Sequence, residues 1–302
     1  MLSEEKPDIV VLAHFDLRLY PLALCLQELE LPYVIIGHDR ELCPVPGGGR
    51  HDSFLRGMMI KRSSWIAANS RHTESLIAAW KVRPDQIKIV YPPISPEAMK
   101  ESSLVLNHPY ASDNRLTLVT ICRLVTGKGV DLVLHALKIL DAREIPYQYL
   151  VGGDGPEKER LRALADTLGL QGKVKFKGSV VGEDKWCLLR MADVFVLSSR
   201  FEPSIQWQEG FGIALVEAAA FGLPAIGSTS GGIPDAVVHG ETGILVPEES
   251  PQGIADALTL LYREPEIRLR MGKAARERAR SQFSPAAIAT NFRNEFAKAA
   301  RG

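Results

Sequence analysis

The sequence has no excess of one charge, no long apolar run and few cysteines, and each absence excludes a class of protein. Lysine plus arginine and aspartate plus glutamate both number 36, so no overall field points to nucleic acid as a partner. No run of about 18 or more apolar residues occurs, so we expect no transmembrane helix. The four cysteines include no Cys-x-x-Cys pair, which predicts reduced thiols in a cytoplasmic protein.

Hydrophobic residues, in contrast, are abundant. Of the 302 residues, 46% are hydrophobic, which is enough for the cores of two domains. The start, MLSEEKPDIVV, has neither the basic region nor the apolar core of a secretory signal, so we expect no such signal.

Short apolar runs rich in valine and isoleucine alternate with stretches of helical period. This alternation predicts an α/β protein with parallel sheets covered on both faces. The expected strands are 8–13, 33–36, 65–68, 87–90, 116–121, 147–151, 174–176, 193–197 and 224–226, and the expected helices include 130–140, 156–168, 184–191 and 213–221. After Val246 the pattern is helical to the end, with a break at Pro285.

The alternation stops at Tyr91-Pro92-Pro93 and the polar stretch 96–114, which we interpret as a linker between two domains. The amino-terminal domain is then expected at residues 1–107, joined by the last helix at about 285–302. The second domain is expected at residues 108–284.

Two cations, Arg123 and Lys128, follow the expected strand 116–121, and a helix is expected to begin near Val130. Ligands of open α/β sheets bind beyond the carboxyl ends of the strands. Two cations on such a loop suit an anion with several oxygens, for example a diphosphate. A solvated basic turn is the alternative that the spacing alone leaves open.

Two carboxylates, Glu209 and Glu217, stand in the stretch QEGFGIALVEAAAFGLPAI. A helix expected to open near Gly212 offers backbone N–H groups to a phosphate, and the glycines let a ligand approach closely. At roughly 1.5 Å per residue the carboxylates are about 12 Å apart, too far for the pair of a glycoside hydrolase. They fit two ends of one long ligand, with hydroxyls near Glu209, a diphosphate at the glycines and a ribose near Glu217.

Both carboxylates also have a purely structural interpretation. Glu209 could be a helix-start carboxylate favoured by the helix dipole, and Glu217 could be an exposed helix residue. However, Leu215, Val216 and Ala218 surround Glu217, and an unpaired carboxylate among apolar neighbours is costly. This context favours a binding role.

These residues resemble the retaining nucleotide-sugar glycosyltransferases of family 4. Five motifs occur in that family's order: the loop 123–129, GGDGP at 152–156, VKFKG at 174–178, Glu-x7-Glu at 209–217, and SGGIPD with GETG at 230–243. The resemblance covers about residues 7–296. It implies the GT-B fold, in which two Rossmann-like parallel-sheet domains face a cleft.

The resemblance also implies roles for individual residues. Arg123 and Lys128 would hold the donor diphosphate, Glu209 would contact sugar hydroxyls, and Glu217 would bind the ribose. The backbone that faces the sugar and phosphates would be that of Gly210, Phe211, Gly212 and Ile213.

Further roles fall at other strand ends. The main chain at Val180 would read the base. His14, which ends the family-like strand PDIVVLAH, would face the donor sugar, although a packing role is the alternative. His38, at the next strand end, is similar to a histidine of the acceptor side.

The sequence departs from the family pattern in two places. Cys122 stands where glycine usually precedes the arginine, which should matter little. Family members also normally have another strand, a glycine-rich loop and a helix before PDIVV. Here the amino-terminal domain is expected to be shortened, which bears on the acceptor site more than on the donor site.

The implied mechanism follows from charge. Cleavage of the anomeric C–O bond gives an oxocarbenium-like sugar and a diphosphate with new negative charge. Arg123, Lys128 and the helix N-terminus would face that charge, and one preorganised donor contributes about 3–4 kcal/mol. The resemblance implies retention, with acceptor attack on the same face and proton transfer to the departing phosphate. Because no Asp-x-Asp occurs, we expect no metal and no cofactor.

The sequence therefore predicts a metal-independent, retaining glycosyltransferase of polysaccharide biosynthesis. Its donor would be a nucleotide-diphosphate sugar, UDP-glucose first and GDP-mannose second, and its acceptor a saccharide or a lipid-linked sugar. Alternatives are a donor-binding, catalytically inactive partner subunit, or a GT-B enzyme of another reaction, such as a nucleotide-sugar epimerase. We expect a monomer with no nucleic acid partner.

A basic segment at 54–83 is rich in aromatic residues and methionines. Its cations are Arg56, Lys61, Arg62, Arg71, Lys81 and Arg83, against the single acid Glu74. This composition suits a peripheral contact with anionic lipid at the inner membrane surface, where a lipid-linked acceptor would lie. The alternative is that Met58, Met59 and Trp65 are core of the first domain.

Overall fold

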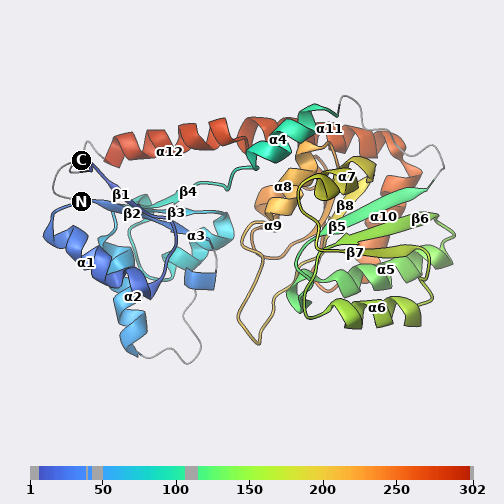
Figure 1. The fold of residues 1–302 in the computed structure, drawn as a ribbon, viewed down its shortest axis with the longest axis horizontal. Helices are drawn as coiled ribbons and strands as arrows, with labels where there is room; N and C mark the ends of the chain where they lie inside the picture. Colours follow the sequence, from blue (N-terminus) through green and yellow to red (C-terminus); the bar gives the residue numbers. More distant parts are fainter. Residues whose placement is uncertain (1–6, 39, 43–49, 106–114, 300–302) are drawn as a thin grey trace.

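The computed structural model describes residues 7–38, 40–42, 50–105 and 115–299, which form two parallel sheets (Figure 1). The first has the order β1-β2-β3-β4, with strands Val10–Leu12, Tyr33–Gly37, Trp65–Ala68 and Ile87–Ile89. The second has the order β10-β9-β8-β5-β6-β7, with β5 Leu116–Ile121, β6 Tyr147–Gly152, β7 Val174–Gly178, β8 Val194–Leu197, β9 Ala225–Ser228 and β10 Gly243–Val246. The predicted α/β architecture is confirmed, and the sequence prediction missed only β10 among these strands.

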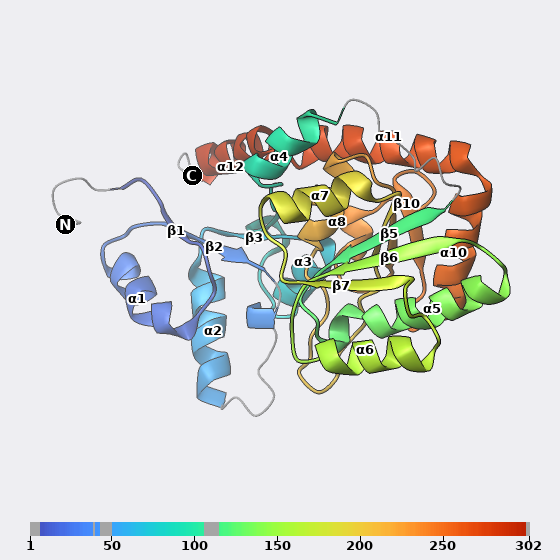
Figure 2. The same cartoon turned by 45° about the vertical axis from the view of Figure 1, so that its right-hand side comes forward.

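The first sheet is covered on both faces, as apolar parallel strands require. One face packs against α1 Tyr20–Glu28, α2 Arg50–Arg62 and α3 Arg71–Ala78, and the other against α12 Pro285–Ala299. Trp65 of β3 lies against Phe292 and Phe296 of α12, with ring centroids 6.2 and 5.4 Å apart. Figures 1 and 2 show α12 running along the first sheet, far in sequence from its strands.

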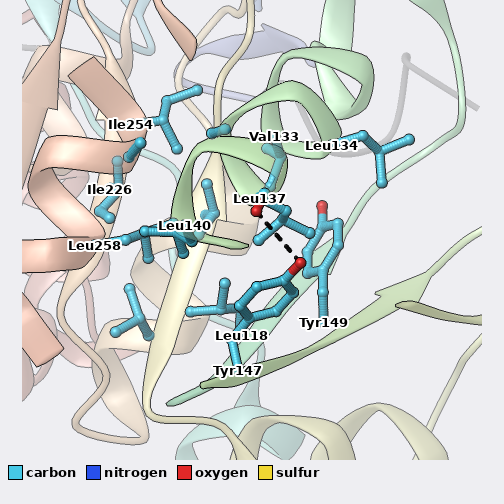
Figure 3. Packing of buried hydrophobic residues seen from close by; sticks show 14 of the residues in the cluster. Leu118, Val133, Leu134, Leu137, Leu140, Tyr147, Tyr149, Ile226, Ile254 and Leu258 are labelled. Atoms are coloured by element: carbon cyan, nitrogen blue, oxygen red, sulfur yellow. Dashed lines mark hydrogen bonds between the residues drawn. The ribbon is translucent and has the colours of Figure 1, made fainter. Parts of the chain in front are cut away.

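The second sheet carries the larger cores. Its helices are α5 Val130–Ala142, α6 Lys158–Thr167, α7 Glu183–Met191, α8 Ile213–Ala220, α9 Ile233–Ala236, α10 Pro251–Arg263 and α11 Pro265–Gln282. Figure 3 shows one face, where Leu137 and Leu140 of α5 pack over Leu118 and Tyr147. The hydroxyl of Tyr147 donates to the carbonyl of Leu137 at 3.3 Å. This buried face includes β5, which leads into the loop that carries the predicted cations.

Part of the predicted linker is helical, and the division that it marks stays a prediction. Residues Pro96–Ser103 form helix α4, which packs against α8. Ile94 and Ala98 are fully buried in the core that α8 and α11 share. The expected domain division between residues 107 and 108 lies outside the described residues and stays a prediction, as does the reduced thiol expected for Cys43. The other cysteines, Cys25, Cys122 and Cys187, carry free thiols.

The basic segment 54–83 divides between core and surface. Met59 and Trp65 are buried in the first domain, which favours the core alternative for these two. Phe54 is 62% exposed, and Lys61 and Arg62 are also exposed on α2. Within the described ranges, no helix is both long and apolar enough to cross a bilayer.

Asp235, in α9, links the two domains. Its carboxylate accepts hydrogen bonds from the Arg71 backbone N–H at 2.7 Å, the Arg71 guanidinium at 3.0 Å and the Tyr91 hydroxyl at 3.1 Å. Burial, and then the neighbouring Asp235, raise the pKa of Tyr91. Because Asp235 is only 4% exposed, its removal would leave these donors without their partner.

We expect Asp235→Ala to lower the free energy of unfolding by about 2 kcal/mol, since a buried acceptor is lost. For a chain of 302 residues that corresponds to a Tm about 3 °C lower by calorimetry. Asp85→Ala is the matched control, because Asp85 is 74% exposed and pairs with exposed Arg83. An equal fall in Tm in both variants would show that the Asp235 contact between the domains adds no more stability than an exposed ion pair does.

Candidate functional site

The carboxyl ends of strands from both sheets meet at one cavity of about 470 Å³, which we call the interdomain cavity. His38 follows β2 and Asn69 follows β3, and both line it from the first domain. The second domain contributes residues from the loops after β5 and β8, namely Cys122, Arg123, Lys128, Trp207, Glu209, Gly210, Phe211, Gly212 and Ile213. The structure thus brings together most of the residues predicted for the diphosphate and the sugar.

Lys128 and Glu209 form an ion pair at this cavity. Their side chains are 17% and 11% exposed, and the Lys128 ammonium also lies 4.9 Å from the centre of the Trp207 ring. Gly129, which follows Lys128, has φ +64°, and a Cβ there would lie 2.0 Å from the carbonyl oxygen of Ser198. Only glycine therefore allows this loop to pack so closely against the end of β8.

Arg123 and Cys122 lie beside this pair. Arg123 is exposed and lines the cavity, so its guanidinium is open to a ligand. Burial raises the pKa of the Cys122 thiol to about 12. The cysteine at the family's glycine position is therefore a neutral wall residue at pH 7, and the expectation that this departure matters little stays a prediction.

The start of helix α8 gives the second half of the site. Gly212 precedes the helix with φ +91° and no side-chain cap, so the first N–H groups of α8 have no capping side chain there. Phe211 is buried and packs against Tyr91 and Phe283, with both ring centroids 5.5 Å away. Ile213 is 47% exposed. This helix start can bind an anion through backbone N–H groups.

Gly231 and Gly232 of the SGGIPD motif support the backbone around Glu209. The N–H of Gly232 donates to the carbonyl of Glu209 at 2.7 Å. A Cβ on Gly231 would lie 2.2 Å from the Glu209 carbonyl oxygen, and one on Gly232 would lie 2.0 Å from that of Gly210. These two glycines therefore position the loop by close backbone packing.

Glu217 is buried, so the interpretation of this residue as an exposed helix residue is wrong. It is 6% exposed on α8, and Lys185 of α7 donates to its carboxylate at 2.6 Å. The pair offsets the cost of an isolated buried carboxylate. Glu217 is not among the residues that line the interdomain cavity. Sequence reasoning missed Lys185, because no spacing links it to a residue 32 positions away.

Val180 and His14 lie beyond the cavity lining. Val180 follows β7, and its side chain packs so close to Gly152 that a Cβ there would lie 2.6 Å from it. His14 is exposed after β1, with its ring centroid 6.2 Å from that of His38. His38 lies 3.0 Å, through Nε2, from the Ala13 carbonyl oxygen. The two histidines thus lie together at the first sheet's carboxyl edge.

Arg200 is a further residue that sequence reasoning missed. Its guanidinium donates to both carboxylate oxygens of Asp131 at 2.6 and 2.7 Å, and to Glu249 at 3.1 Å. Its Nε donates to the Thr126 carbonyl, and its backbone N–H to the Gly127 carbonyl at 2.9 Å. Arg200 therefore fixes the loop after β8 against the loop that carries Lys128.

Comparison with known proteins agrees with this geometry. Residues 108–278 match the model of the family described as glycosyl transferases group 1. A GDP-mannose-dependent alpha-(1-6)-phosphatidylinositol monomannoside mannosyltransferase of Mycobacterium tuberculosis is 35% identical over 59% of this chain and 46% of its own length. Glycogen synthase of the same organism is 28% identical over 98% of this chain and 70% of its own length. The chain thus spans about half the length of the first of these relatives.

Solved structures show the same fold. Anabaena Alr3699/HepE in complex with UDP and glucose has a TM-score of 0.75 at 20% identity, covering 96% of this chain and 77% of its own. A glycosyltransferase from Rickettsia africae has a TM-score of 0.80 at 17% identity, covering 99% and 78%. The GT-B architecture is confirmed. The family match spans more than half of the residues, and the chain belongs to the glycosyl transferases group 1 family.

Proposed function

We propose that this protein transfers a hexose from a nucleotide-diphosphate sugar to a saccharide or lipid-linked acceptor. The observation that carries the proposal is the Lys128–Glu209 pair, which lines the same cavity as exposed Arg123 and the uncapped N-terminus of α8. Two cations and a row of backbone N–H groups suit a diphosphate. A carboxylate beside them suits sugar hydroxyls, because it accepts hydrogen bonds and donates none.

The mechanism assigns a separate task to each group. Arg123, Lys128 and the N–H groups at Gly212 and Ile213 would stabilise charge on the departing diphosphate. Glu209 would then orient the sugar through its hydroxyls while remaining close to Lys128. The acceptor hydroxyl would attack from the face that the diphosphate leaves and give it the proton, so that the product retains its configuration. Glu217, neutralised by Lys185, would hold the ribose.

Turnover of defined donors tests this function. The purified chain should hydrolyse or transfer sugar from UDP-glucose or GDP-mannose, measured by release of the nucleoside diphosphate. A binding partner without activity would bind the nucleotide, seen as a higher Tm, but release none. An epimerase would change the configuration of the sugar with no net release of the nucleoside diphosphate. Either result would reject the proposal.

We further propose that the reaction needs no metal, because Arg123 and Lys128 carry the charge that a divalent ion would otherwise supply. Donor cleavage should therefore be unchanged after dialysis against EDTA, when it is measured by diphosphate release. Added Mn²⁺ or Mg²⁺ should alter the rate less than about twofold, since the two positive charges are already in place. Strict dependence on either ion would contradict this account.

A further inference from the structure

The chain passes from the first domain to the second after β4, and it returns between α11 and α12 (Figure 1). The first of these crossing segments carries Tyr91, and the second carries Phe283. A hydrogen bond of 2.8 Å from the Ile94 N–H to the Phe283 carbonyl joins the two segments. They therefore lie side by side where the domains meet.

Tyr91, Phe283 and Phe211 form a closed cluster of three rings, which we call the aromatic junction. The Tyr91 ring stacks on that of Phe211, with centroids 5.5 Å apart and 27° between the planes. Phe283 meets both rings edge-on, at centroid distances of 5.5 Å and angles of 76° and 68°. Aromatic pairs prefer such offset-stacked and T-shaped arrangements. One ring from each crossing segment thus contacts the same ring of the second domain.

Phe211 belongs to the proposed donor site. Its side chain is 2% exposed, but its backbone lies between Gly210 and Gly212, and all three residues line the interdomain cavity. Gly212 directly precedes the first turn of α8. Because glycines flank Phe211 and contribute no side-chain contacts, its ring is the side chain that anchors this three-residue segment.

Polar contacts hold the other two rings of the aromatic junction. The Tyr91 hydroxyl donates to the Asp235 carboxylate at 3.1 Å. The Arg278 guanidinium lies 4.7 Å from the centre of the Phe283 ring. It also donates to the carbonyls of Asp235 and Ala236, both at 2.7 Å. Tyr91 and Phe283 are therefore tied to α9, and Phe211 packs against both.

We infer that Tyr91 is a positioning residue of the donor site. It holds the Phe211 ring, and through that ring it keeps the N–H groups at the start of α8 in the arrangement that binds the donor diphosphate. This inference rests on the proposed function, in which those groups face the departing diphosphate. Donor affinity in the second domain then depends on a residue of the segment that arrives from the first.

The size of the expected effect follows from the ring contacts. Without the Tyr91 ring, Phe211 loses its stacked partner, and donor binding must order a segment that is now ordered in advance. The loss of one aromatic pair corresponds to about a two- to tenfold change in Kd. Exposed residues of α11 and α12 form a groove that borders Tyr91, so Tyr91→Ala widens an existing groove and leaves no closed cavity.

Calorimetric binding of UDP and GDP tests the inference. Tyr91→Ala should raise the Kd of the nucleotide that the wild type binds by about two- to tenfold. Tyr91→Phe should restore most of the affinity, because it keeps the ring and loses only the hydroxyl. If circular dichroism shows that Tyr91→Ala does not fold, Tyr91→Leu replaces it, with the same expected rise.

Three results would overturn the inference. The first is wild-type affinity in the folded variant that lacks the ring. The second is a loss of affinity in Tyr91→Phe as large as in Tyr91→Ala. The third is a wild type that binds neither UDP nor GDP, because there would then be no nucleotide site to position.

Two comparisons separate positioning from a general loss of stability. Phe296→Ala is the matched control, because it removes a partly buried ring that contacts Trp65. It should lower the Tm but leave the nucleotide Kd unchanged, and a rise equal to that of Tyr91→Ala would reject the positioning role. In the double variant of Tyr91→Ala with Phe211→Leu, the losses of affinity should be clearly less than additive, since Tyr91 acts through Phe211. Additive losses would also reject it.

Nucleotide binding requires no turnover, so this inference and the proposed function can fail separately. If Tyr91→Ala weakens nucleotide binding but the wild type consumes neither UDP-glucose nor GDP-mannose, Tyr91 positions a nucleotide site and the proposed transfer fails. If the wild type turns over a donor and Tyr91→Ala binds the nucleotide as tightly as the wild type, the transfer stands and the positioning role fails.

Discussion

Lys128→Ala should lower the turnover of the donor sugar by about 10²–10³-fold, or about 3–4 kcal/mol in the transition state. The lysine lies at the proposed leaving diphosphate, and its removal also leaves the Glu209 carboxylate, 11% exposed, without its cation. The effect should appear mainly in kcat, measured by diphosphate release at saturating donor, because the charge develops as the bond breaks.

Two controls define this result. Lys138→Ala removes an exposed lysine from α5 and should leave turnover unchanged. In the double variant with Glu209→Ala, the losses should be clearly less than additive, since the two groups form one pair. A loss below about tenfold for Lys128→Ala would mean that the lysine is not at the diphosphate, because one preorganised donor is worth more than that.

Glu217→Ala should weaken binding of a nucleoside diphosphate by about 10–100-fold, as expected for the loss of one or two hydrogen bonds to a charged group. The carboxylate is the proposed partner of the ribose hydroxyls, and without it Lys185 keeps an uncompensated charge at that position. The measurement is the Kd of UDP and of GDP by calorimetry. At saturating donor, kcat should change much less.

Two variants compared with each other test the direction in which the donor binds, with its sugar at Glu209 and its ribose at Glu217. Glu209→Ala should mainly lower kcat and leave nucleotide affinity nearly intact, because Glu209 is assigned to the sugar. Glu266→Ala, an exposed carboxylate on α11, is the control for a simple change in net charge. Equal loss of nucleotide affinity in the Glu209 and Glu217 variants would reject the assigned direction of the donor.

Local patterns predicted the sheets, the main helices and the cation loop, because each depends on residues close in sequence. Runs of valine and isoleucine mark buried parallel strands, and Gly212 before an apolar run marks the start of α8. Helix α4 could also have been predicted from the sequence. Ser95 caps it by accepting from the Ala98 N–H at 3.1 Å, and Pro96 occupies its first turn. Those two residues are ordinary helix-start signals.

Other features could not be predicted locally, because they join residues that only the fold brings together. Lys128 and Glu209 are 81 positions apart, and Arg200 and Asp131 are 69 apart. Strand β10 is short, begins at a glycine and completes one edge of the second sheet, so its composition resembles that of a loop. The aromatic junction depends on where the two crossing segments meet, and no periodic pattern indicates that meeting.

The position of α12 has a consequence for the order in which the two domains complete their cores during synthesis. Strands β1–β4 leave the ribosome first, yet Trp65 and Val34 meet their partners, Ile288 and Phe292, only after the second domain has been translated. At about 5–20 residues per second, the roughly 200 intervening residues take about 10–40 s. During that time one apolar face of a four-stranded sheet is open to solvent, so the first domain completes its core last, although it is synthesised first.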